Sequence, residues 1–322
     1  FGIRSNAQRR SASRLSTNTA IKLNSKPEDF SREYFNTNMT TFKEHLSKIV
    51  FFGTDEFAVI VLQKLVEAGF DIIAVVTPPD EAVGRKKQLR ASPVKLEASR
   101  LNLEIIQPRR LKDFEMPECD LGVVVVYGKI IPKKILAMPK HGFLNIHPSL
   151  LPKYRGPSPI KTAIYNGDTE TGVTIIELDS EMDHGDVVVS SKYQIPNDKL
   201  HTEIRNELAT LGAELLIKTI PDYIAGKITP TPQDHAKATH TKLLTREDGK
   251  VDWSRSPQEI YNQFRAYHDW PTAWFIKGET RIIIRNAELK DGKFIIKTLQ
   301  PEGKNPMSML DYINGYGPLS NS

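Results

Sequence analysis

Apolar runs alternate with segments of helical spacing along the chain from Lys48 onward. Strands are predicted at 48–53, 71–77, 104–107, 120–128, 142–147, 171–179 and 186–195. Helices are predicted at 57–66, 93–101 and 201–226, where apolar residues recur every three or four positions. Because the Val- and Ile-rich runs are nearly continuous and are separated by helices, the pattern predicts an α/β fold with a doubly wound, mostly parallel sheet covered on both faces.

The pattern changes after residue 226. Residues 227–240 are polar and interrupted by proline, which is typical of a linker. A helix is then predicted at 257–267, followed by short strands whose separators include Asp291-Gly292, a strong hairpin sequence. We therefore expect two domains, an α/β domain at 48–226 and a smaller β-rich domain at 241–322.

The first 47 residues precede the first predicted strand and lack apolar periodicity. Residues 1–38 hold seven of the 44 basic and three of the 39 acidic side chains, which leaves 37 basic and 36 acidic side chains for residues 39–322. Such a basic, serine-rich composition is typical of disordered segments and of mitochondrial transit peptides. We interpret residues 1–47 as a disordered leader or an upstream extension.

The composition is that of a soluble globular protein, with 39% hydrophobic and 26% charged residues. No stretch reaches the roughly 18 uncharged apolar residues of a membrane span, so a membrane protein is excluded. Cys119 is the only cysteine, which excludes a disulfide framework and a cysteine-based zinc site and fits a reducing compartment.

A candidate site follows from the predicted strand that ends in FLNIH. Asn145 and His147 are two residues apart, so on an extended chain both side chains leave the same face. An amide donor beside an imidazole suits acyl transfer, since both can stabilise a developing oxyanion and the imidazole can act as an acid. A carboxylate is needed to orient the imidazole. Three candidates lie on one loop, in which Gly185 gives conformational freedom: Asp179, Asp183 and Asp186.

Two other kinds of site are disfavoured. His184 and its acidic neighbours could suggest a metal, but no second histidine shows ligand spacing with it, so no metal is expected. Gly53 after the first strand could suggest a dinucleotide, but the segment lacks the G-x-G-x-x-G turn. Asp55 and Glu56 would also place negative charge where a phosphate should meet the helix N-terminus.

The connection 78–93 is long for a loop between a strand and a helix. Its basic side chains are Arg85, Lys86, Lys87 and Arg90. A positive loop suits a phosphate-rich partner such as RNA, whose affinity is dominated by backbone charge. A solvated charged loop explains the same residues equally well.

Residues 145–160 (NIHPSLLPKYRGPSPI) and 171–186 (TGVTIIELDSEMDHGD) resemble the signature of the folate-dependent formyltransferases. The resemblance implies that Asn145, His147 and Asp183 are the catalytic group. It also implies 10-formyltetrahydrofolate as co-substrate, without a metal. The residues implied to contact the folate are Ser149, Leu150, Leu151 and Pro152.

Further segments resemble the members of this family that act on methionyl-initiator tRNA. These segments are 50–58, 77–95, 250–275 and 299–308. The resemblance implies that the basic loop contacts the tRNA acceptor arm and that the second domain is an OB-like barrel that binds tRNA. The barrel is shortened, because only residues 284–298 separate its strand around Ile283 from the LQPEGK segment. Two departures from the family pattern are Lys86, where a second glycine is usual, and Pro148, where many members have glycine.

The implied reaction moves the formyl group to the α-amino group of methionyl-initiator tRNA and gives N-formylmethionyl-tRNA for translation initiation. Two alternatives stay open: a formyltransferase for an amino sugar nucleotide, and an RNA-binding protein without activity that keeps the fold. We expect a monomer in the bacterial cytoplasm, or in the mitochondrial matrix if residues 1–38 are a transit peptide.

Overall fold

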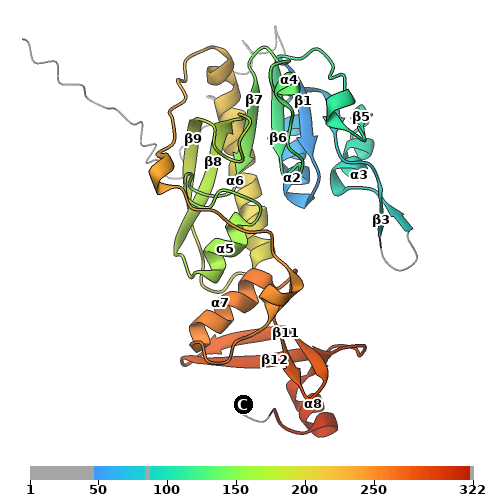
Figure 1. The fold of residues 1–322 in the computed structure, drawn as a ribbon, viewed down its shortest axis with the longest axis vertical. Helices are drawn as coiled ribbons and strands as arrows, with labels where there is room; N and C mark the ends of the chain where they lie inside the picture. Colours follow the sequence, from blue (N-terminus) through green and yellow to red (C-terminus); the bar gives the residue numbers. More distant parts are fainter. Residues whose placement is uncertain (1–46, 84–87, 320–322) are drawn as a thin grey trace, which may run out of the picture. The chain divides into compact units, whose positions relative to one another are not determined.

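A seven-stranded sheet forms the centre of the larger lobe in the computed structural model, which describes residues 47–83 and 88–319 (Figure 1). The strand order is β5-β2-β1-β6-β7-β8-β9, and the five strands from β5 to β7 are parallel. The strands β8 and β9 are antiparallel to their neighbours. The bounds are β1 Lys48–Gly53, β2 Asp71–Val76, β5 Ile105–Ile106, β6 Leu121–Val125, β7 Phe143–His147, β8 Glu170–Glu177 and β9 Val187–Gln194.

Helices cover the sheet on both faces, which confirms the predicted doubly wound fold. The helices of this lobe are α2 Glu56–Glu67, α3 Pro93–Arg100, α4 Lys133–Leu136, α5 Pro159–Tyr165 and α6 His201–Ile224. Ile49 and Phe51 of β1 join the core under α2 and α6, whereas Val50 and Phe52 join a second core on the other face with α4. The apolar run of β1 is therefore continuous because alternate residues serve two different cores.

The basic connection after β2 contains a pair of short strands, where the sequence predicted a loop. β3 (Glu81–Val83) and β4 (Gln88–Arg90) form an antiparallel pair that extends from the edge at which β2 ends (Figure 1). Arg90 is exposed on β4. The three other basic residues predicted to meet RNA, Arg85, Lys86 and Lys87, lie outside the described residues.

The smaller lobe contains α7 (Pro257–Tyr267), an antiparallel sheet and α8 (Met309–Tyr316). Its strands are β10 Trp274–Lys277, β11 Thr280–Lys290, β12 Lys293–Pro301 and β13 Met307–Ser308. Asp291 and Gly292 have φ of 51° and 71° and form the predicted tight turn between β11 and β12. In the described chain the sheet is open, with β10 and β13 as its edges.

Residues 227–240, the predicted linker, run along the larger lobe. Thr231 pairs with Val187 at the start of β9, and His240 forms an isolated bridge with Arg155. The backbone N–H of Arg155 donates to the carbonyl of Thr239 at 2.8 Å. This segment is therefore fixed at several points to loops of the α/β lobe.

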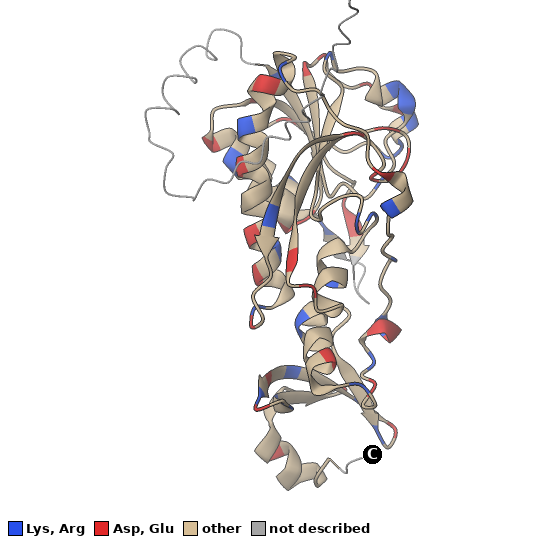
Figure 2. Cartoon of the chain, turned by 90° about the vertical axis from the view of Figure 1, so that its left-hand side faces the viewer, with Lys and Arg blue, Asp and Glu red and all other residues tan. Residues whose placement is uncertain are grey.

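Charges of both signs are interspersed over the described elements (Figure 2), in keeping with the near balance of residues 39–322. Among the same residues, no helix combines the length and apolar character needed to cross a bilayer.

Candidate active site

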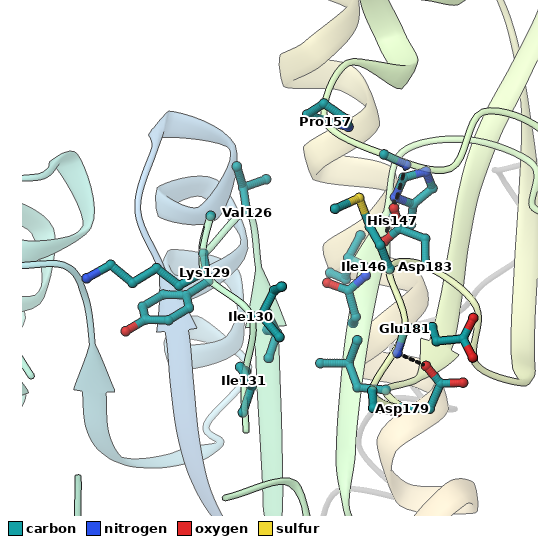
Figure 3. A pocket seen from close by; sticks show the side chains of 18 of the residues that line it. Val126, Lys129, Ile130, Ile131, Ile146, His147, Pro157, Asp179, Glu181 and Asp183 are labelled. Atoms are coloured by element: carbon teal, nitrogen blue, oxygen red, sulfur yellow. Dashed lines mark hydrogen bonds and ion pairs between the residues drawn. The ribbon is translucent and has the colours of Figure 1, made fainter. Parts of the chain in front are cut away.

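A cavity of about 490 Å³ lies between the loop after β6 and the loop after β8 (Figure 3). One wall is apolar and includes Val126, Ile130 and Ile131. The opposite wall carries the polar groups, among them Asn145, His147 and Asp183. The structure thus brings the three residues implied by the resemblance to one cavity.

Asn145 and His147 reach the cavity because β7 ends at His147. The two residues lie in a strand that is buried along its whole length, and they share one face of it. Ile146, between them, points into the core under α6 on the other face. Within the described residues, the Asn145 side chain makes no hydrogen bond, so its amide is free to donate into the cavity.

Both ring nitrogens of His147 face acceptors. Nε2 lies 2.9 Å from the carbonyl oxygen of Tyr154, which can only accept, so Nε2 carries a proton. Nδ1 lies 3.4 Å from Oδ1 of Asp183. When the imidazole is charged, Nδ1 also donates, and the carboxylate then faces a cation directly. Among the described residues, the imidazole is thus held by two segments outside β7.

The carboxylate of Asp183 is held at both oxygens. Its Oδ2 accepts the backbone N–H of Gly156 at 2.7 Å, while Oδ1 faces His147. Burial opposes ionisation of this carboxyl. The hydrogen bond and charge of His147, the Gly156 N–H and the charge of Arg155 outweigh that effect, so the pKa of Asp183 lies below its ordinary value. Asp183 is accordingly a carboxylate at neutral pH.

Of the three acidic candidates, only Asp183 contacts His147. Asp179 lines the cavity, but its Oδ2 pairs with Nδ1 of His184 at 2.6 Å. Asp186 is half-buried and is not among the cavity residues. In the described part of the chain, no group of three or more His, Cys, Asp or Glu side chains is arranged to hold a metal ion.

Gly185 is required by a close contact that the sequence did not indicate. A Cβ at this position would lie 1.8 Å from the carbonyl oxygen of Glu177. The glycine therefore permits a close approach of two backbone segments at the base of the loop.

The segment Ser149–Pro152 lies next to the site but does not line the cavity. Ser149 is fully buried, and its hydroxyl donates to the carbonyl of Lys153 at 2.6 Å. Leu150 packs against Gly172 of β8, where a Cβ would lie 2.5 Å from its Cδ2. In the structure these residues support the turn that leads from His147 to Tyr154 and Gly156.

Sequence reasoning missed two buried polar residues beside the site. Arg155 is 5% exposed and Gln233, in the predicted linker, is 6% exposed. The Oε1 of Gln233 accepts from Nη2 of Arg155 at 2.7 Å, and its Nε2 donates to the carbonyls of Asp183 and Gly185. A single amide in a polar, proline-interrupted segment has no periodic pattern, so nothing in the sequence alone distinguished Gln233 from the rest of the linker.

Comparisons with known proteins agree with this fold and site. The formyl transferase model matches residues 47–220, and the model of the formyl transferase C-terminal domain matches residues 243–294. An N-formyltransferase from Helicobacter canadensis, solved with folinic acid and dTDP-3-aminofucose, matches 77% of this chain and 89% of its own with a TM-score of 0.60 at 20% identity. The chain therefore belongs to the formyl transferase family, whose members are enzymes.

The curated relatives narrow this class. The methionyl-tRNA formyltransferase of Roseiflexus castenholzii is 40% identical over 299 residues, which cover 83% of this chain and 96% of the relative. A methionyl-tRNA formyltransferase from Clostridium thermocellum has the same fold, with a TM-score of 0.56 at 18% identity over 80% of this chain and 99% of its own. Within the formyl transferases, the chain belongs to the methionyl-tRNA formyltransferase family.

Proposed function

We propose that the chain transfers the formyl group of 10-formyltetrahydrofolate to the α-amino group of methionine on initiator tRNA. The observation that carries the proposal is the convergence of Asn145, His147 and Asp183 on one cavity with an apolar opposite wall. Family membership supports the reaction type and the acceptor. The cavity volume of about 490 Å³ is within the usual range for small-molecule sites.

In the proposed reaction the amine nitrogen attacks the formyl carbon and a tetrahedral oxyanion forms. The free amide of Asn145 donates to that oxygen. The carbon–nitrogen bond to the folate then breaks, the amine loses a proton, and the folate nitrogen gains one. Asp183 stabilises the charged form of His147 and relays the proton from the amine.

The hydrogen bond from Nε2 of His147 to Tyr154 decides which residue donates to the oxyanion. Because Nε2 already donates to Tyr154, direct donation from His147 to the oxyanion requires that this bond be shared or broken. Asn145 is therefore the direct oxyanion donor in the proposal, and the His147–Asp183 pair supplies positive charge and proton transfer. Contact between folate and the segment Ser149–Pro152 remains a prediction.

The proposed tRNA surface includes the basic hairpin β3–β4 and the smaller lobe. Of the four basic residues predicted to contact tRNA, only Arg90 is described, and it is exposed beside the edge at which the parallel strands end. Arg90→Ala should raise the KM for tRNA about fivefold, since one phosphate contact is lost, and leave the KM for folate unchanged. Lys227→Ala, which removes an exposed cation at the end of α6, is the control. Equal tRNA kinetics in both variants would remove Arg90 from the interface.

The function is tested by incubating the purified chain with 10-formyltetrahydrofolate and methionyl-initiator tRNA and measuring N-formylmethionyl-tRNA. A parallel reaction offers an amino sugar nucleotide as acceptor. Formylation of tRNA alone is expected. Formylation of the sugar alone, or of neither acceptor, would overturn the proposal.

The compartment and the oligomeric state are part of the same proposal. We propose a monomer in the cytoplasm, with the mitochondrial matrix as the alternative if residues 1–38 act as a transit peptide. Sedimentation and N-terminal mass spectrometry of the native protein test these two points.

A further inference from the structure

The segment 227–240 contacts both parts of the chain that hold the catalytic pair. Tyr154, whose carbonyl accepts from His147, donates its backbone N–H to the Thr239 hydroxyl at 2.8 Å. The loop that carries Asp183 is contacted from the other side by Gln233. One segment outside the α/β sheet therefore touches the supports of both members of the pair.

The amide of Gln233 is fully used. Its Nε2 donates to the carbonyl of Asp183 at 2.9 Å and to the carbonyl of Gly185 at 2.7 Å. Its Oε1 accepts from Nε and Nη2 of Arg155 at 3.2 and 2.7 Å. Because the cationic guanidinium polarises the amide, the two bonds to the carbonyls are strengthened. Gln233 thus connects Arg155 to the loop that follows β8.

The loop needs such a support at this position. Asp183 has a φ of 52°, in the left-handed region that residues with a side chain rarely adopt. A conformation of this kind costs about 1 to 3 kcal/mol and persists only where the surroundings fix it. Gln233 donates to the carbonyls of Asp183 itself and of Gly185, which lie at the two ends of the turn 183–185.

Arg155 links the same support to the other contact of the carboxylate. It is followed by Gly156, whose N–H donates to Oδ2 of Asp183. Arg155 is also bound through its backbone to Thr239 and Thr241, and its Nη2 lies 2.8 Å from Nδ1 of His235. A shift of Gln233 would therefore disturb Asp183 through its own backbone and through its hydrogen-bond donor.

We propose that Gln233 is a positioning residue for formyl transfer, whose two amide donors hold the Asp183–Gly185 turn so that the Asp183 carboxylate stays aligned with His147. This inference rests on the proposed function, since it assigns Asp183 to the reaction. Gln233 is not among the residues that line the cavity, so it acts through Asp183 and should affect turnover more than substrate binding.

The chain offers a closely matched control. Gln263 on α7 is 2% exposed, and its Nε2 also donates to two backbone carbonyls two residues apart, those of Asp248 and Lys250, both at 3.0 Å. It is outside the cavity and contacts neither His147 nor Asp183. Replacing either glutamine by Met keeps the side-chain size and removes both donors. Gln233→Met also removes an acceptor from Arg155, whereas Oε1 of Gln263 has no hydrogen-bond partner in the described chain, so Gln233→Glu, which keeps that acceptor, is compared beside it. Only the losses at Gln233 reach the catalytic pair.

The experiment compares Gln233→Met, Gln233→Glu and Gln263→Met with the wild-type chain. The measurements are kcat per folded enzyme, both KM values, and hydrogen exchange of the backbone amides of residues 183–187. We expect kcat to fall about 10- to 100-fold in both Gln233 variants, because small displacements of a catalytic group have effects of this order. Both KM values should stay within about threefold, and exchange at 183–187 should accelerate. Gln263→Met should keep the wild-type kcat and exchange.

Three results would overturn the inference. They are a kcat within about twofold of wild type in either Gln233 variant, an equal fall in Gln263→Met, and unchanged exchange at residues 183–187 in the Gln233 variants. Gln233→Glu keeps an acceptor for Arg155 but loses both donors, so full activity in this variant would mean that the contact with Arg155 matters and the turn does not. If the wild-type chain forms no N-formylmethionyl-tRNA, the proposed function fails, and the exchange measurement still decides whether Gln233 fixes the turn.

Discussion

Replacing Asp183 by Asn removes one charge from the candidate catalytic pair with little change of shape. The new side chain has an oxygen that can still accept from the N–H of Gly156, so this contact of the loop is kept. What is lost is the negative charge 3.4 Å from Nδ1 of His147. The variant therefore tests the electrostatic part of the mechanism separately from the position of the loop.

The distance and burial give the size of the effect. At 3.4 Å, two unit charges attract by about 1 kcal/mol in water and about 5 kcal/mol at an effective dielectric constant of about 20. The side chains of His147 and Asp183 are 5% and 14% exposed, so the higher value is the better guide. If about half of it, roughly 2.5 kcal/mol, is realised only in the transition state, kcat falls about 70-fold.

The assay is steady-state formylation at saturating folate and tRNA, with kcat expressed per folded enzyme. Asp269→Asn is the control, because Oδ2 of Asp269 lies 3.2 Å from Nδ1 of the buried His201 in a second pair outside the cavity. The control should lose stability and keep its kcat. A kcat for Asp183→Asn within about threefold of wild type, or an equal fall in the control, would refute the electrostatic reasoning.

Asn145→Ala should lower kcat about 10²- to 10³-fold in the same assay, because this is the usual effect of losing an oxyanion donor. A rise in both KM values with an unchanged kcat would contradict the role of Asn145 as oxyanion donor. Gly185→Ala should lower the melting temperature, because a Cβ would lie 1.8 Å from the Glu177 carbonyl oxygen; an unchanged melting temperature would contradict that packing. The pKa of Asp183 is lower in the folded chain than in the unfolded chain, so its ionised carboxylate increases the free energy of unfolding. This increase is fully present above the ordinary pKa of about 3.9 and is lost as the pH falls through the pKa of the folded chain. In urea unfolding, the loss of unfolding free energy caused by Asp183→Asn should therefore become smaller below about pH 4. A loss that does not change with pH would argue against a lowered pKa of Asp183.

The apolar pattern was sufficient to predict the sheet, because its central strands β1, β6, β7 and β8 are buried along most of their length. β1 has the predicted bounds, and its alternate residues enter two cores. The pattern predicted a loop where β3 and β4 pair, since a short exposed ribbon has no buried face and leaves no apolar signal. The contacts of residues 227–240 could not be predicted for the same reason. They are made largely by single polar groups, which leave no apolar pattern in the sequence.

Asn145 and His147 could be found from the rule that active sites lie at the carboxyl ends of parallel strands, but Asp183 could not. β8 is antiparallel to β7, with Thr174 opposite His147 and Glu177 opposite Leu144. β8 therefore ends about 10 Å away from the end of β7 at which His147 lies, because each strand residue advances about 3.3 Å. The loop 178–185 has to return along β7 before Asp183 can face His147.

This return explains why the carboxylate needs support from distant parts of the chain. The base of the loop is closed where the N–H of Glu177 donates to the carbonyl of Asp186 at 2.9 Å, next to the close approach at Gly185. Beyond Leu178, whose N–H donates to the carbonyl of Phe143 at 2.9 Å, no strand of the described chain pairs with the loop. Asp183 is instead fixed by Gly156 and Gln233, which come from segments before and after it in the sequence. A change at Gln233, which does not line the cavity, should therefore alter catalysis through the position of Asp183.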